Sequence, residues 1–183
     1  MILPSILLAL MFAGTSGCNQ AHSISAGQAR WVERQGGLSS CDATRQRLQK
    51  ACESILASVD VPVRLQLLDS RSPNAWSWPS GEIYVSFELL QIFTDDEVAA
   101  VVGHELGHLI SDGHLNSRLS LASPAGSLDI EANADAIGRR LLIAGAKDAN
   151  AMRSALGKLA AHPATTPATR RAIERRIDRL GAL

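Results

Sequence analysis

Two histidines and a glutamate lie close together in the stretch VVGHELGH, at positions 104, 108 and 105. On a helix, residues four positions apart share a face, so His104 and His108 can both reach one ion. Zinc accepts neutral imidazole as a ligand, and a catalytic zinc keeps one position open for water. Glu105 projects beside the pair, where it can take a proton from that water rather than bind the metal. The spacing therefore predicts a catalytic zinc site.

The residues around this pair favour a ligand role over an accidental match. The segment is strongly apolar, and two unpaired imidazoles would be costly to bury in such a helix. Gly103 and Gly107 each lower the helix propensity of the segment by about 1 kcal/mol. We expect another helix or a ligand to approach closely at these two glycines.

A third ligand is expected from a second helix. The stretch EANAD supplies Glu131 and Asp135, which are again four apart on one face. Glu131 can complete a site of two histidines and one glutamate. Asp135 can lie behind it and orient a ligand histidine through the other ring nitrogen. An exposed acidic helix face is the alternative for such a pair alone, but its position downstream of the histidine pair favours the metal site.

The elements that carry these residues form the order helix, small sheet, then helices, which makes the fold class α+β. Residues 41–58 have helical periodicity, and residues 61–69 alternate as a strand. Two short extended pieces flank Pro79-Ser80-Gly81 and predict a hairpin whose second strand runs through Phe87.

The histidine helix and the helices after it have clear boundaries. Thr94 and Glu97 form a capping box that starts the histidine helix, which is expected to stop near residues 112–113. The EANAD helix is expected to end at Gly145. Later helices are expected over about 149–161 and from Pro167, which suits a first turn; the last one carries Ile173, Ile177 and Leu180 inward.

The start of the chain resembles an export signal. An apolar run is followed by small residues and Cys18, and TSGC resembles a bacterial lipobox, although Thr15 replaces an aliphatic residue and no Lys or Arg precedes the run. We interpret residues 1–18 as a lipoprotein signal with Cys18 lipidated, 19–38 as a tether with an irregular start, and 39–183 as the domain. The protein is then expected in the periplasm or cell envelope, held at a membrane by a lipid anchor.

Export would place Cys41 and Cys52 in an oxidising compartment. If both lie on one helix they are about 16 Å apart, too far for a disulfide. They can pair only if Cys41 lies outside the helix and the chain doubles back, so the sequence leaves this disulfide open.

The charge balance gives no indication of a nucleic-acid partner. The chain has 18 basic and 18 acidic residues. Residues 153–183 are locally basic but contain no aromatic residue for base stacking, so we interpret them as a solvated helix face.

HELGH followed by EANAD resembles zinc metallopeptidase family forty-eight, the HtpX and CAAX prenyl endopeptidase type of the gluzincin group. The stretch NAWSWPSGEIYVSFELL resembles the family segment before the histidine helix. DDEVAAVVGHELGH is similar to the family's start of that helix, and AAHPATTPATRRAI resembles its His-Pro and arginine element. Together the motifs cover about residues 60–180.

The resemblance implies a mainly helical zinc metallopeptidase domain with a small sheet whose edge strand flanks the active site. The family's zinc ligands fall on His104, His108 and Glu131. Glu105 becomes the general base and acid, and Asp135 lies behind the ligands.

Two further site residues are implied by the same resemblance. An arginine after the His-Pro pair would contact the carboxylates near the metal, and Arg170 and Arg171 are the candidates. His162 would approach the zinc or the oxyanion, although alanine replaces the usual threonine before it. A histidine that simply ends a helix before proline is the alternative for His162.

These observations lead us to expect a zinc-dependent endopeptidase that cleaves extended or unfolded polypeptides. The expected substrate platform is Asn74, Ala75, Trp76 and Trp78, where a peptide can add to a sheet edge. Trp76 and Trp78 either pack substrate side chains or close the core. An envelope chaperone that holds clients beside a zinc site is the main alternative, against which the intact Glu105 argues. A zinc hydrolase acting on a non-peptide bond is a third.

Overall fold

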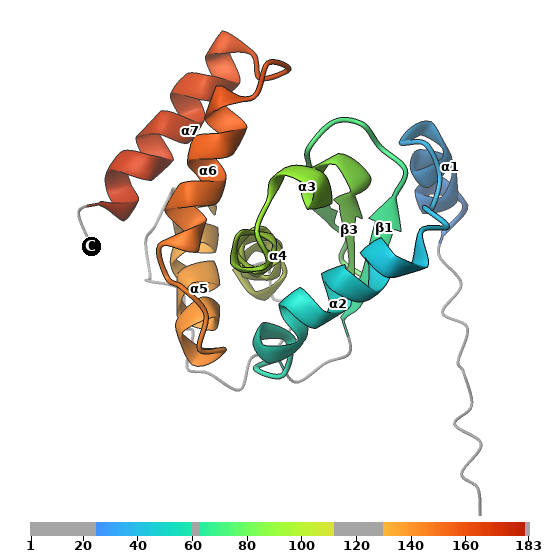
Figure 1. Ribbon diagram of the computed structural model, residues 1–183, viewed down its shortest axis with the longest axis horizontal. Coiled ribbons are helices and arrows are strands. Elements are labelled where there is room, and N and C mark those ends of the chain that lie inside the picture. Colours follow the sequence, from blue (N-terminus) through green and yellow to red (C-terminus); the bar gives the residue numbers. More distant parts are fainter. Residues whose placement is uncertain (1–24, 60–62, 112–129, 182–183) are drawn as a thin grey trace, which may run out of the picture.

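The computed structural model describes residues 25–59, 63–111 and 130–181. Helices lie on both sides of a small sheet, which confirms the α+β class (Figure 1). The expected signal and the lipidation site at Cys18 lie outside the described residues, as does the predicted stop of the histidine helix at 112–113. Among the described residues, no helix has the length and apolar character needed to cross a bilayer.

The sheet has three strands in the order β1-β3-β2. Strand β1 (Arg64–Leu68) is parallel to β3 (Glu82–Ser86), and β2 (Ala75–Ser77) is antiparallel to β3. The predicted hairpin is therefore confirmed, and its turn contains Gly81 at φ 88°, a conformation that glycine adopts without steric cost. Within the described residues β2 has a strand neighbour on one side only, so it is a sheet edge.

The chain turns into a short helix directly after β3. We predicted that the strand continues through Phe87, which is wrong: α3 (Phe87–Ile92) begins there. The Ser86 hydroxyl accepts a hydrogen bond from the backbone N–H of Leu89 at 3.3 Å, and this N-terminal cap starts the helix.

Helix α4 (Asp95–Ser111) begins at the predicted capping box. The backbone N–H of Thr94 donates to the Glu97 carboxylate at 2.7 Å, and the N–H of Glu97 donates to the Thr94 hydroxyl at 3.3 Å. The reciprocal pair satisfies two backbone donors that a helix start would otherwise leave unpaired.

Helix α4 lies at the centre of the molecule, seen end-on in Figure 1. The sheet and α2 (Asp42–Leu56) lie on one side of it, and α5 (Ile130–Ala144) and α6 (Ala151–Ala161) lie on the other. Helix α7 (Pro167–Leu180) packs against α6 at the rim. The core around α4 includes these fully buried side chains: Leu48, Ile55, Leu67, Ile83, Leu106 and Leu141.

The predicted tether over residues 19–38 needs correction where the structure describes it. Helix α1 (Ala26–Arg34) forms there and packs on the face of the sheet opposite α4. Gln28 is buried, and its side-chain amide donates to the Tyr84 hydroxyl at 2.9 Å. Trp31 packs edge-to-face against Tyr84, with ring centroids 5.3 Å apart. This long-range burial stabilises a helix that composition alone did not indicate.

The two described cysteines are free thiols. Cys41 caps the N-terminus of α2 from outside the helix, whereas Cys52 lies in the core. Burial raises the pKa of the Cys52 thiol to about 12. The disulfide that the sequence left open is therefore not formed in this structure.

Candidate metal centre

Glycines bring the backbones of α4 and α5 into direct contact. A Cβ added to Gly107 would lie 2.5 Å from the carbonyl oxygen of Ala134, and one added to Gly103 would lie 3.3 Å from the Cα of Gly138. Only glycine fits at Gly107, because a real Cβ does not approach a backbone oxygen so closely. The close approach expected at both glycines is confirmed, and it places the start of α5 beside the histidines of α4.

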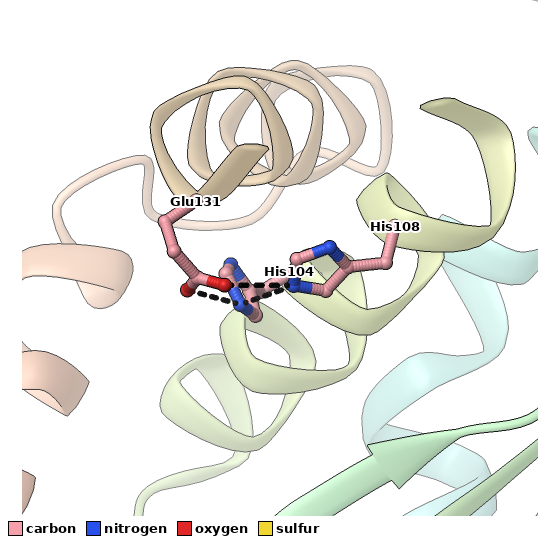
Figure 2. Close-up of side chains that lie close together, drawn as sticks. All are labelled: His104, His108 and Glu131. Carbon is pink, nitrogen blue, oxygen red and sulfur yellow. Dashed lines mark hydrogen bonds and ion pairs between the residues drawn. The ribbon is translucent and has the colours of Figure 1, made fainter. Parts of the chain in front are cut away.

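His104, His108 and Glu131 converge at this contact (Figure 2). The Nε2 atoms of His104 and His108 are 3.1 Å apart. Glu131 places Oε2 3.4 Å from His104 Nε2 and Oε1 3.5 Å from His108 Nε2. Ligands at 2.0–2.1 Å around a tetrahedral zinc are about 3.3 Å from one another. One ligand atom from each of the three side chains lies within 4.8 Å of the other two, so a small movement of the Glu131 carboxylate would bring all three onto one ion.

Asp135 lies one turn further along α5 and fixes the orientation of His104. The His104 Nδ1–H donates to Asp135 Oδ1 at 2.9 Å. With its proton on Nδ1, the ring keeps the Nε2 lone pair for a metal, as in the usual pairing of a carboxylate with a metal-bound histidine. Two imidazole nitrogens, a carboxylate oxygen and this supporting carboxylate form a donor set that suits zinc.

An arginine also contacts these carboxylates, and it is Arg176. Its Nε donates to Asp135 Oδ2 at 2.8 Å, and its Nη1 lies 3.1 Å from Glu131 Oε2. The two candidates from the sequence, Arg170 and Arg171, are exposed on the first turns of α7. The structure thus brings Arg176 to the site in place of either candidate.

The missed arginine had a signal in the sequence. Ile173 is buried on the inner face of α7, and Arg176 follows it by three positions, which places both on the same face of a helix. Its predicted neighbours on the inward stripe, Ile177 and Leu180, also pack against the core. Choosing the arginine by helical register rather than by distance from the His-Pro pair would have selected Arg176.

The charges of this network are strongly coupled. Burial disfavours the charged form of His104, but the hydrogen bonds that its ring donates to Asp135 and Glu131 outweigh burial and raise its pKa to about 9. A bound metal would take the place of the Nε2 proton. Burial alone would raise the pKa of Asp135, but the Arg176 guanidinium outweighs it and holds that pKa below its usual range. The hydrogen bond from His104 is the main cause that lowers the pKa of Glu131. Both carboxylates are therefore ionised near neutral pH, as a metal ligand and its supporting group must be.

Glu105 lies beside the ligands on α4 and is half-buried. Its Oε2 accepts a hydrogen bond from the Ser77 hydroxyl of β2 at 2.8 Å. Ser77 lies within the NAWSW stretch but was not among the site residues expected from the sequence.

Comparison with known proteins agrees with this geometry. The model of "Peptidase family M48" matches residues 42–181, which contain every residue of the centre described above. The chain belongs to peptidase family M48. It is 33% identical over 93 residues to the metalloprotease YcaL of Escherichia coli strain K12, covering 50% of this chain and 34% of YcaL. It is 36% identical over 61 residues to the metalloprotease LoiP of the same strain, covering 33% of this chain and 24% of LoiP. The matches thus span about a third or less of the length of these relatives.

The M48 centre opens into a hollow of about 400 Å³. Strand β2 forms one wall, and helix α6 contributes apolar side chains to the lining. The apolar lining consists of Leu89, Val101, Met152, Ala155, Leu156 and Leu159. Of the expected substrate platform, Asn74, Ala75 and Trp76 line this hollow, whereas Trp78 does not.

The two tryptophans of the platform pack on α1. Trp76 and Trp78 meet Trp31 edge-to-face, with ring centroids 5.2 and 5.6 Å apart. Of the two roles that the sequence left open, closing a small core therefore applies to both. Trp76 also reaches the hollow of the M48 centre.

His162 is not among the residues that line the hollow of the M48 centre. It ends α6 as the C-terminal cap, and its Nδ1 accepts a hydrogen bond from the backbone N–H of Ala164 at 3.2 Å. It lines a neighbouring hollow that shares Asn74 and Arg176 with the M48 centre. This position matches the alternative that the sequence offered, a histidine that ends a helix before proline.

Proposed function

We propose that this chain is a zinc-dependent endopeptidase that cleaves extended or unfolded polypeptides by activating a water. The observation that carries the proposal is the convergence of His104, His108 and Glu131 on one point, with Glu105 beside them in the same hollow. Membership of the M48 family and the two metalloprotease relatives support it.

Each side chain of the centre has a role that follows from its position. His104, His108 and Glu131 would hold zinc, a Lewis acid that polarises a carbonyl and lowers the pKa of a water. Glu105 takes the proton of the attacking water and gives it to the leaving amine. Asp135 and Arg176 keep the His104 ring and the Glu131 carboxylate in place through the contacts described above.

The walls of the hollow suggest how a polypeptide would bind. Strand β2 is the edge strand of the described sheet and lies next to Glu105, and an extended peptide can pair with such an edge through main-chain hydrogen bonds. The apolar wall of α6 would receive a large apolar side chain close to the scissile bond. Folded proteins rarely offer an extended segment whose main-chain groups are unpaired, so unfolded segments are the substrates proposed here.

The proposed location is the bacterial cell envelope, with a lipid anchor at Cys18 holding the chain to a membrane. This part of the proposal is supported by the apolar run and the TSGC stretch at the start of the sequence.

The proposal is tested by incubating the purified chain with a permanently unfolded polypeptide, such as a reduced and alkylated protein. Mass spectrometry then identifies the products with the protein as purified, after chelation, and after zinc is added back. We expect internal cleavages that disappear with the chelator and return with zinc. Intact polypeptide in all three samples, with zinc bound to the protein, would contradict the proposed function.

A further inference from the structure

Ser77 presents its side chain to the histidine helix. It lies two residues after Ala75 in β2, so the two side chains share a face of the sheet. Ala75 is buried in the core around α4, and Ser77 pairs in register with Ile83, which is also in that core. The inner face of β2 therefore ends in a hydroxyl group where it meets the hollow.

The hydroxyl of Ser77 engages the residue that the proposed reaction needs as its base. Its Oγ donates to Glu105 Oε2 at 2.8 Å. A glutamate side chain has several rotamers of similar energy, and a hydrogen bond to a charged group selects one of them. With Oε2 held in this way, Oε1 is the carboxylate oxygen left to accept a proton.

Strand β2 is fixed from its other face. Trp76 of β2 and Trp78, directly after the strand, pack against Trp31 of α1. The strand is therefore held between α1 and α4, so the Ser77 hydroxyl is presented from a firmly packed element. A positioned donor of this kind is what a catalytic carboxylate needs behind it.

We propose that Ser77 is a positioning residue that holds the Glu105 carboxylate in its working orientation. The inference rests on the proposed peptidase function. It adds to that function a direct connection between the strand that would bind substrate and the general base.

The same residue lies on the edge that a substrate would use. The backbone N–H of Ser86 in β3 donates to the Asn74 carbonyl at 3.0 Å, and the N–H of Trp78 donates to the Glu82 carbonyl at 2.8 Å. These main-chain groups of Asn74 and Trp78 therefore point toward β3. In an antiparallel pair the direction of these groups alternates, so the main-chain groups of Ala75 and Ser77 point to the edge that has no strand neighbour among the described residues. The Ala75 N–H donates there to Asn74 Oδ1 at 2.9 Å. A peptide paired with Ser77 is thereby aligned with the carboxylate that Ser77 holds.

The test compares zinc-loaded wild type with Ser77→Ala and Ser77→Thr on one unstructured peptide. We expect Ser77→Ala to lower kcat about tenfold, the effect of losing a hydrogen bond to a charged group. KM and zinc content stay close to the wild-type values, because the main chain of β2 and the ligands are unchanged. Ser77→Thr keeps the hydroxyl and restores most of kcat. Ser72→Ala, an exposed serine before β2, is the matched control.

The inference is overturned if Ser77→Ala keeps the wild-type kcat, or if Ser77→Thr is as impaired as Ser77→Ala. A second measurement does not need activity: a double-mutant cycle on the unfolding equilibrium with Ser77→Ala and Glu105→Ala. We expect the unfolding equilibrium constant of the double variant to differ about fivefold from the product of the two single effects, which is in the range for side chains in direct contact. If wild type cleaves nothing, the peptidase proposal fails, and this cycle alone decides whether Ser77 holds Glu105. If the effects of the two substitutions on the unfolding equilibrium are independent, the inference that Ser77 holds Glu105 is overturned.

Discussion

At the scale of single residues, the centre is a chain of contacts that runs from α7 to the ligands. Arg176 contacts both Asp135 and Glu131, and Asp135 contacts His104. Each buried charge in this chain therefore has a partner of opposite sign, which is the condition under which a charge can be buried at acceptable cost. Without this support the His104 ring would not be held in the orientation that a metal needs.

The ligand assignment predicts different results for two histidines of the same chain. His108→Ala removes one of three ligands, so we expect zinc affinity to fall by at least about 100-fold. His162→Ala is the matched control and keeps one zinc per chain, because His162 caps α6 and is not part of the group that can hold a metal. Elemental analysis after dialysis at limiting free zinc measures both. Equal zinc content in the two variants would remove His108 from the ligand set.

At the scale of elements, the contact between α4 and α5 decides whether the ligands meet. Gly103 and Gly138 let the two backbones touch, and Gly107 lies against Ala134. Ligands from two helices can share one ion only if those helices are this close. The glycines therefore serve the metal centre even though none of them touches it.

Gly107→Ala tests this role of the helix contact. The new methyl group meets the Ala134 backbone at 2.5 Å, so α4 and α5 must move apart, and we expect a loss of about 3 kcal/mol in the free energy of unfolding. Zinc affinity falls with it, because Glu131 moves with α5. Denaturant unfolding and zinc titration measure the two effects.

Gly157→Ala in α6 is the matched control for this change. No atom lies within 4 Å of the added methyl group, so the better helix propensity of alanine should raise the free energy of unfolding by about 0.5–1 kcal/mol. If both variants behaved alike, the close approach at Gly107 would have no energetic consequence.

The start of α4 is joined to α6 through Glu97. This carboxylate is 3% exposed and accepts hydrogen bonds from Ser154 at 2.5 Å and from Lys158 at 2.6 Å. Burial would raise the pKa of Glu97, but these two partners outweigh it and lower that pKa below the ordinary value of 4.5. Because the folded pKa is lower than the unfolded one, the stabilisation is present above about pH 4.5 and is lost as the pH falls through the folded pKa.

Glu97→Gln should therefore lower the free energy of unfolding at pH 7 by about 2 kcal/mol, since it removes hydrogen bonds to a buried charge. The difference from wild type should shrink as the pH falls below about 4.5. Denaturant unfolding at pH 7 and near pH 3.5 measures this. Glu53→Gln, on the exposed face of α2, is the control. A difference that is independent of pH would contradict an ionised Glu97 in the folded state.

At the scale of the whole molecule, the sequence predicted the parts that depend on local pattern. The helix of His104, its capping box and the hairpin all have short-range signals, and the structure contains them. Helix α1 was missed because its apolar residues are few, and it is stabilised by contacts with aromatic side chains far along the chain. Arg176 and Ser77 were missed for a related reason, since helical register and the packing of β2 on α4 decide which side chains face the site.

Helix α1 also extends the fold beyond the region that matches the family, which begins at residue 42. It covers the outer face of the sheet and packs Trp31 on both tryptophans of the β2 segment. Helix α1 is thus part of the structure that supports the edge proposed to bind substrate, and it belongs in any protein prepared for activity measurements.

The measurement that tests the central claim most directly is cleavage of an unfolded polypeptide by Glu105→Gln beside wild type, with zinc content determined on the same samples. The substitution keeps the shape of the side chain but removes its capacity to accept a proton at neutral pH. We predict one zinc per chain in both proteins and a cleavage rate at least about 100-fold lower in the variant, the usual contribution of a positioned general base. Cleavage by zinc-loaded Glu105→Gln at the wild-type rate would contradict the account.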